Sequence, residues 1–116
     1  MNLPDSYNEL IDEAYSNSLY NKLVFQLKKD FALANVELDV DVEISAESLK
    51  LILHEAVFHL IQNKFSEYLN LLYIIDVAEQ KIKSLDGSNI YILSEQVSFL
   101  ILQREWQKVW FRAAYS

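Results

Sequence analysis

The stretch IYILSEQVSFLILQREWQKVWFRAA, residues 90–114, holds both tryptophans of the chain and no proline or glycine, so it predicts one long helix. With about 100° of rotation per residue, its apolar side chains fall on two opposite faces. The first face carries Ile90, Leu93, Val97, Leu100 and Ile101, and the second carries Phe99, Leu102, Trp106, Val109 and Trp110. Because a helix with two apolar faces needs packing partners on both sides, we predict that it lies centrally in a bundle or between two subunits.

The composition of the chain predicts a single all-α domain that spans residues 1–116. Hydrophobic residues make up 52% of the sequence, which is enough to build one core. Only one glycine and one proline are present, whereas a β-sandwich of this length would need many turn residues. We therefore expect an irregular bundle of four to five helices with one extended acidic segment wrapping it.

Helical spacing of apolar residues begins after residues 4–6, which combine proline, aspartate and serine as helix starts often do. Residues 16–18 interrupt the spacing, so the sequence leaves open whether residues 5–34 form one kinked helix or two. Asn35 is expected to end this region, since asparagine tolerates the left-handed conformation found after helices.

An acidic segment, residues 36–44, replaces the helical spacing with strict alternation of apolar and acidic side chains. Such alternation predicts extended backbone with one apolar and one solvated face. The sequence contains no second run of this kind, and a lone strand would leave its backbone groups unpaired. We therefore favour an extended segment that wraps the bundle, and whether it pairs as a strand stays open.

The region after the acidic segment predicts a further helix that starts at Ser45, because serine is a favoured N-cap. Its apolar stripe runs through residues 49–61. Beyond that stripe, residues 69–75 are apolar nearly all round, which is typical of a buried segment.

The last connection of the chain carries three further helix signals. Residues 76–79 resemble a capping box that would start a short helix. Gly87 would end this helix, because glycine takes a positive φ without steric cost. Ser88 or Asn89 would then cap the final helix.

No motif of the sequence indicates a catalytic, cofactor or metal site, so we predict that the chain is not an enzyme and binds no cofactor. Cysteine is absent, and His54 and His59 are five residues apart, so on a helix they diverge by about 140° instead of sharing a face. We expect ordinary solvent-facing or hydrogen-bonded histidines. The acids of residues 39–43 lack the glycine and the final glutamate that a calcium loop requires at its sixth and twelfth positions.

The charge distribution argues against nucleic acid and anionic membranes as partners. The net charge is −7, and the whole excess lies in residues 1–47. Phosphate backbones and anionic lipids bind clustered lysine and arginine instead. The N-terminal residues do not resemble a signal peptide, and no uncharged run approaches the roughly 20 residues that a membrane-spanning helix needs. We therefore predict a cytoplasmic protein.

The tryptophan-bearing face of residues 90–114 is the predicted interface of a homodimer. Tryptophan is over-represented at interface anchors, and a chain of this size offers few helices to cover both apolar faces. The alternative is that the aromatic stripe of Phe99, Trp106 and Trp110 packs into the core of the monomer. The predicted interface residues are Phe99, Leu102, Trp106, Val109 and Trp110.

A basic row on the same helix, formed by Arg104, Lys108 and Arg112, is the second candidate site. The three residues follow one another at four-residue spacing and therefore share a face. Their nearest candidate ligand is the acidic segment, in the same chain or in a neighbour; the alternative is a solvated basic edge. The acidic residues of this predicted dock are Glu37, Asp39, Asp41 and Glu43.

These features predict a small acidic protein–protein interaction or adaptor module that self-associates through its C-terminal helix. Its partner would be a second copy of the chain or another protein. One alternative is an inhibitor or immunity-type protein that meets a basic partner with its acidic N-terminal third. The other is an enzyme or small-ligand binder without a recognisable motif.

Overall fold

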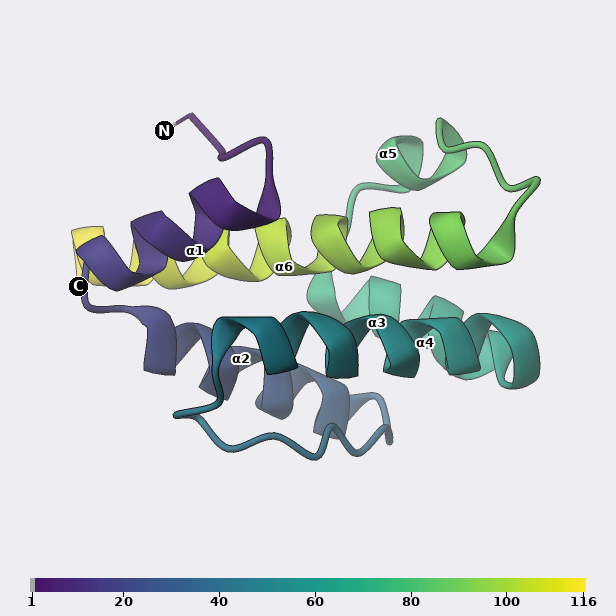
Figure 1. Ribbon diagram of the computed structural model, residues 1–116, viewed down its shortest axis with the longest axis horizontal. Helices are drawn as coiled ribbons and strands as arrows, with labels where there is room; N and C mark the ends of the chain where they lie inside the picture. The colour runs from purple at the N-terminus through teal and green to yellow at the C-terminus, as the bar shows by residue number, and fades with distance from the viewer. Residues whose placement is uncertain (1) are drawn as a thin grey trace.

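The computed structural model describes residues 2–116 and is all-helical there, with no strand. Figure 1 shows α6 running the length of the molecule, with α1 along its C-terminal half and α5 near its N-terminal half. The predicted helix content is confirmed, but the described residues form six helices instead of four to five, because the helix breaks at Lys64, which separates α3 from α4. The helices are α1 (Tyr7–Ser16), α2 (Tyr20–Leu33), α3 (Ala46–Asn63), α4 (Phe65–Ile75), α5 (Glu79–Lys83) and α6 (Ile90–Tyr115).

Helix α6 is the central element, and it packs against α1, α2, α3 and α4. Val97 and Ile101 of its first apolar face are buried, and so are Leu102 and Trp106 of its second face. The prediction that α6 is covered on both sides is therefore confirmed, and one chain supplies the cover. The Gln103 side-chain amide also donates a hydrogen bond to the carbonyl of Pro4 (2.9 Å), which ties the segment before α1 to the middle of α6.

The N-terminal region forms two helices, which answers the question that the sequence left open. Ser6 caps α1, with its hydroxyl accepting from the backbone N–H of Glu9 (3.2 Å). Ser18 takes a positive φ of 57° between the helices, so the chain turns there before α2 begins. Asn35 takes a positive φ of 65° after α2, as predicted.

The acidic segment is a connection between α2 and α3 that passes below α2 in the view of Figure 1. Leu38 and Val40 are buried while the four acidic side chains are exposed, so burial alternates as the sequence predicts. The segment pairs with no strand among the described residues. Its N-terminal half packs on the core through these two apolar side chains.

The helix caps confirm two predictions and correct two others. Ser45 caps α3, and Asn89 caps α6 by accepting from the N–H of Ile92 (3.0 Å). The predicted capping box is wrong: Asp76 ends α4 in the left-handed conformation, and α5 starts only after Ala78. Gly87 does not end a helix either, because α5 has already ended at Lys83.

Residues 69–75 are not buried all round, which corrects another prediction. Leu71 and Ile75 are fully buried, but Leu69 is 52% and Tyr73 83% exposed. The physical reason is that α4 lies at the edge of the bundle, where α2, α3 and α6 cover only one of its sides. An apolar sequence therefore leaves an apolar outer face on α4.

Candidate functional site

The predicted interface residues divide between the core of the chain and its surface. Leu102 and Trp106 are 0% exposed and Val109 is buried, so all three belong to the core and present no surface to a second copy. Phe99 and Trp110 are partly buried and remain accessible. This arrangement favours the alternative in which most of the tryptophan face completes the core of the single chain.

A group of rings at the end of α6, here called the C-terminal aromatic cluster, consists of Trp110, Phe111 and Tyr115. Trp110 meets Phe111 edge-on with ring centres 5.3 Å apart, and Phe111 stacks on Tyr115 at 5.6 Å. Phe111 is 40% and Tyr115 76% exposed. Phe111 and Tyr115 are not among the predicted interface residues, although each follows a residue of the first apolar face, Leu93 or Val97, by 18 residues or five full turns and so continues that face.

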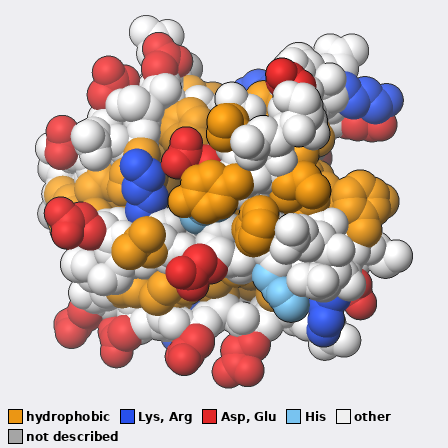
Figure 2. All heavy atoms as spheres, turned by 45° about the vertical axis from the view of Figure 1, so that its right-hand side comes forward, with side chains coloured by type: hydrophobic (Ala, Val, Ile, Leu, Met, Phe, Trp, Pro, Cys, Tyr) orange, Lys and Arg blue, Asp and Glu red, His pale blue; other side chains and the backbone are white. Residues whose placement is uncertain are grey.

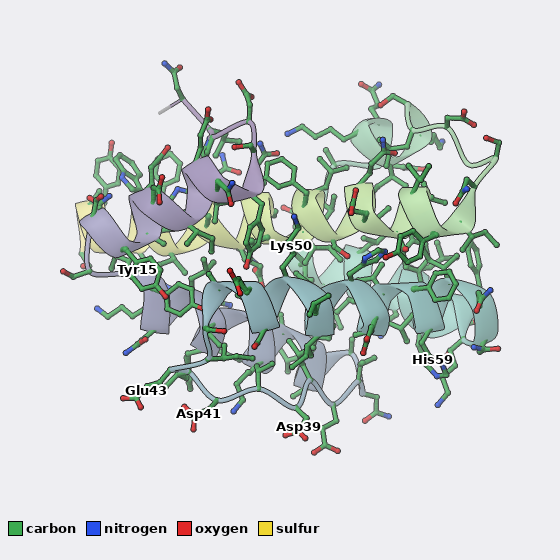
Figure 3. All side chains as sticks on the ribbon, viewed as in Figure 1. Tyr15, Asp39, Asp41, Glu43, Lys50 and His59 are labelled. Carbon is green, nitrogen blue, oxygen red and sulfur yellow. The ribbon has the colours of Figure 1, made fainter. Side chains whose placement is uncertain are left out.

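The basic row finds its partners on α2, α4 and α6 instead of on the acidic segment. Arg104 pairs with the carboxylate of Asp76 (3.0 Å) at the end of α4. Arg112 donates to the side-chain carbonyl of Gln26 on α2 (2.9 Å). Figure 3 shows Asp39, Asp41 and Glu43 on the outer edge, pointing away from α6. Within one chain, the ion pairs of the described residues include none between the basic row and the acidic segment.

Lys108, the middle member of the basic row, reaches the edge of the core with 20% of its side chain exposed, and forms a buried charge cluster with Asp30 and Glu105. Its ammonium nitrogen lies 2.7 Å from Asp30 Oδ2 and 2.5 Å from Glu105 Oε1. Neither carboxyl oxygen of Glu105 has a hydrogen-bond partner among the described residues, so its contact with Lys108 is an ion pair. The Glu105 side chain is 0% exposed and that of Asp30 7%. Lys108 also donates to the carbonyl of Ile75 (3.1 Å), so the cluster joins α2, α4 and α6.

The two carboxyl groups of the cluster have opposite pKa shifts. Burial raises the pKa of Glu105 to about 8, and the neighbouring Asp30 carboxyl adds to this, whereas Lys108 opposes it. Burial alone would also raise the pKa of Asp30, but the neighbouring Glu105 carboxyl and the hydrogen bonds from Lys108 and Gln26 outweigh it and hold the pKa below its usual value. Glu105 is therefore the carboxyl that carries the proton near neutral pH.

The sequence analysis missed both acids of the cluster, although a signal was present. Glu105 is spaced four residues from Ile101 and from Val109, so it lies among core positions of the helix. Asp30 follows Leu27 by three residues in the same way. An acid at a core position of an amphipathic helix predicts a buried and partnered carboxyl.

The histidines are ordinary, as predicted. His54 is buried, and its Nε2 lies 3.0 Å from the carbonyl of Tyr91 and 2.9 Å from the hydroxyl of Ser94. Because the Ser94 hydroxyl donates to the same carbonyl, Nε2 must be the donor. His59 is exposed and contacts the side chain of Asn63 (3.1 Å). Among residues 2–116 no three His, Asp or Glu side chains converge as metal ligands would.

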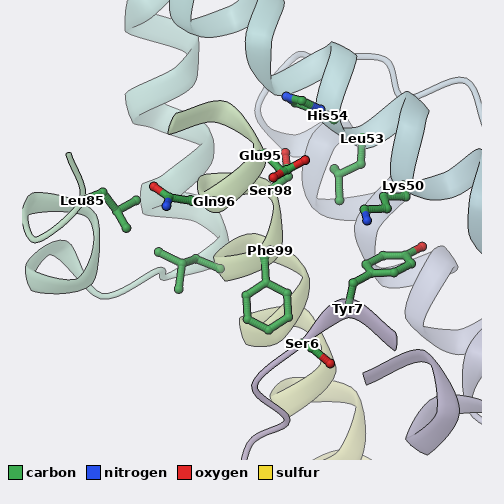
Figure 4. A pocket seen from close by; sticks show the side chains of 11 residues that line it. Ser6, Tyr7, Lys50, Leu53, His54, Leu85, Glu95, Gln96, Ser98 and Phe99 are labelled. Carbon is green, nitrogen blue, oxygen red and sulfur yellow. The ribbon is translucent and has the colours of Figure 1, made fainter. Parts of the chain in front are cut away.

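A pocket of about 360 Å³ lies between α1, α3, α6 and the connection after α5. Figure 4 shows Tyr7 and Lys50 on one side of the pocket and Leu85 on the other, with Phe99 between them. The Lys50 ammonium lies 5.4 Å from the centre of the Tyr7 ring, and the Tyr7 hydroxyl donates to a backbone carbonyl. The wall is mainly apolar. Its polar side chains include Lys50, Glu95 and Gln96, all three exposed, whereas the Tyr7 hydroxyl and His54 are engaged within the chain.

The start of α6 carries a second apolar surface. Ile90, Tyr91 and Ile92 are all exposed, and the Tyr91 ring packs on His54 with centres 4.5 Å apart. Figure 2 shows hydrophobic side chains in a band across the middle of this side of the molecule, with acidic side chains along the lower edge. The two ends of α6 are therefore both apolar at the surface.

Comparison with known proteins gives no match for this chain among protein-family models, curated proteins or solved structures. The helices of residues 2–116 also include none with the length and apolar character to cross a membrane.

Proposed function

We propose that the chain is a small helical protein–protein interaction module that self-associates through its C-terminal aromatic cluster. One observation supports this most directly: the Phe111 and Tyr115 rings contact each other, Trp110 and solvent, while Trp110 is partly packed on the core. Aromatic side chains are enriched at the centres of interfaces and are frequent hot spots. A second copy would remove these rings from water.

The neighbourhood of the cluster supports a two-fold arrangement. Phe25 of α2 is exposed and lines a groove of about 390 Å³ together with Val109 and Arg112. In a symmetric dimer, each cluster would meet the same surface on the partner, and the groove would receive an aromatic ring. The hydrogen bond from Arg112 to Gln26 satisfies a donor but does not neutralise the guanidinium charge, so Arg112 would stay at the solvated rim of the interface.

The acidic segment has a separate role in this proposal. We infer that it wraps the bundle, with a turn at residues 41–44 closed by the Ile44 N–H on the Asp41 carbonyl, and keeps Glu37, Asp39, Asp41 and Glu43 in water. Their repulsion would disfavour association over that side and leave the end of α6 as the preferred contact. We infer a binding role without catalysis, because the pocket wall is mainly apolar. We also infer a cytoplasmic location, which the absence of cysteine suits.

Light scattering on the purified chain tests the self-association. We expect a dimer at micromolar concentration, and a monomer for the double variant Phe111→Ala/Tyr115→Ala with an unchanged circular dichroism spectrum. Tyr73→Ala on α4 is the matched control, because it removes an exposed ring from another surface. A wild-type chain that stays monomeric at high micromolar concentration would refute the proposal, and dissociation by Tyr91→Ala alone would place the interface at the other end of α6.

A second candidate is an inhibitor or immunity-type protein for a basic partner. It is favoured by four exposed acidic side chains on one nonhelical segment, none of which forms an ion pair among the described residues. Charge-steered binding weakens as salt rises. Pull-down at low and high salt, with Asp39→Asn/Asp41→Asn as the variant, should then show capture of a basic protein that is lost in high salt and in the variant.

A further inference from the structure

The buried charge cluster contains more negative than positive groups. Lys108 supplies one ammonium group, and Asp30 and Glu105 supply two carboxyl groups at 2.7 and 2.5 Å from it. With both carboxyls ionised, the cluster would hold a net charge of −1 with Glu105 fully out of water. A buried uncompensated charge is strongly unfavourable, whereas one proton on Glu105 makes the cluster neutral.

The groups around the cluster offer no second cation to Glu105 among the described residues. Arg104 forms an ion pair with Asp76, and Arg112 donates a hydrogen bond to Gln26. The two arginines lie on different turns of α6. Helix α2 contributes Asp30, with the Gln26 amide donating to it, and α4 contributes only the carbonyl of Ile75. The charged groups acting on Glu105 are thus Asp30 and Lys108.

We propose that the buried charge cluster is a proton-controlled latch between α2 and the C-terminal half of α6. The latch closes with one proton on Glu105 and opens more readily as the surroundings become more alkaline. This holds for the single chain, so it stands whether or not the chain self-associates. Trp106 follows Glu105 directly and is fully buried, so opening of this part of α6 would uncover the largest ring of the core.

The direction of the effect follows from the pKa of Glu105, which is about 8 in the closed latch and near its usual value of 4.5 once the side chain reaches water. Between these values the closed form binds a proton that the open form has lost. The opening equilibrium should therefore rise about tenfold for each pH unit up to about 8 and level off above it. Below pH 4.5, the usual pKa of Glu105, the closed form keeps the full stabilisation that this carboxyl group contributes.

Hydrogen exchange of the backbone amides at the C-terminal half of α6, corrected for intrinsic rates, measures this opening between pH 5 and 9. In the wild type we expect the rise of about tenfold per pH unit and the plateau near pH 8. Glu105→Gln, which keeps the shape without the charge, should give a flat profile. Glu95→Gln is the matched control on an exposed turn of the same helix, and it should behave as wild type. A flat wild-type profile, or the same slope in Glu105→Gln, would overturn the latch.

Carboxyl carbon-13 titration of the unaltered chain tests the same proposal without a variant. One glutamate carboxyl, assigned to Glu105, should titrate near pH 8. If every glutamate carboxyl has completed its titration below pH 6, the proton that the latch requires is absent and the proposal is wrong.

Discussion

Tyr20 donates its phenolic hydrogen bond to the backbone carbonyl of Ile44, and this single contact ties the start of α2 to the end of the acidic segment. The Tyr20 ring itself is buried and stacks on Tyr15 with centres 4.4 Å apart. Burial of the Tyr20 hydroxyl group raises its pKa above the usual value, so it remains a donor throughout the physiological range.

Tyr20→Phe should therefore remove the tether and leave the ring in place. We expect a loss of about 1 kcal/mol in the free energy of unfolding, because a partly buried carbonyl loses its donor. Urea unfolding measures the loss, and faster amide exchange in residues 41–45 would locate it. Tyr73→Phe is the control, since that hydroxyl belongs to a side chain 83% exposed; equal losses in both variants would show that the tether contributes nothing.

The two tryptophans should differ sharply when truncated. Trp106→Ala creates a cavity in the core and should cost about 3–5 kcal/mol of unfolding free energy. Trp110→Ala removes a partly exposed ring and should cost the monomer on the order of 1–2 kcal/mol. Thermal unfolding at low protein concentration compares them. A smaller loss for Trp106→Ala than for Trp110→Ala would contradict the core position of Trp106.

The members of the basic row should also differ, because only Lys108 reaches the core. Lys108→Met leaves Asp30 and Glu105 without their cation and should cost about 3–5 kcal/mol at neutral pH. Arg104→Ala breaks a pair with the exposed Asp76 and should cost at most about 1 kcal/mol, with less effect in high salt. Urea unfolding at low and high salt separates the two cases, and a large salt dependence for Lys108→Met would argue against its burial.

Asp30→Asn should lower the pKa of Glu105 without restoring its usual value. The variant removes the neighbouring carboxylate that raises the pKa, but burial, which is the larger cause, remains. The carboxyl resonance of Glu105 should then titrate below pH 8 and above 4.5. Glu95→Gln, which is remote from the cluster in sequence, should leave the Glu105 titration unchanged. An unaltered midpoint in Asp30→Asn would show that the two carboxyls are not coupled.

Helix positions and most helix ends could be predicted because they depend on local chemistry. The 3.6-residue period of apolar side chains defines α3 and α6, and Ser45 and Asn89 cap them through bonds to residues three positions away. The error at Asp76 has a physical origin. An aspartate can cap the start of a helix with its side chain, and its backbone can also take the left-handed conformation that ends one. Because α4 continues to Ile75, Asp76 ends that helix instead of starting α5.

Exposure and pairing could not be predicted, because they depend on which helices become neighbours. The apolar period of α4 does not reveal that α4 lies at the edge and leaves Leu69 in water. The spacing of Arg104 and Lys108 predicts one basic surface, whereas the position of α2 draws Lys108 inward to Asp30. The sequence likewise predicts Trp106 at an interface, because it does not show that the other helices of the same chain bury this side chain.

The hydrogen bond from the Gln103 side chain to the carbonyl of Pro4 joins residues that are 99 positions apart in the sequence, and this separation matters for folding during synthesis. Each of α1, α2, α3 and α4 packs on α6, which is the last of the six helices to leave the ribosome. A nascent chain therefore carries apolar faces without their central partner until α6 has emerged. Its native core assembles only after translation has passed α6, so ribosome-bound chains depend on their own solubility, or on a chaperone, until then.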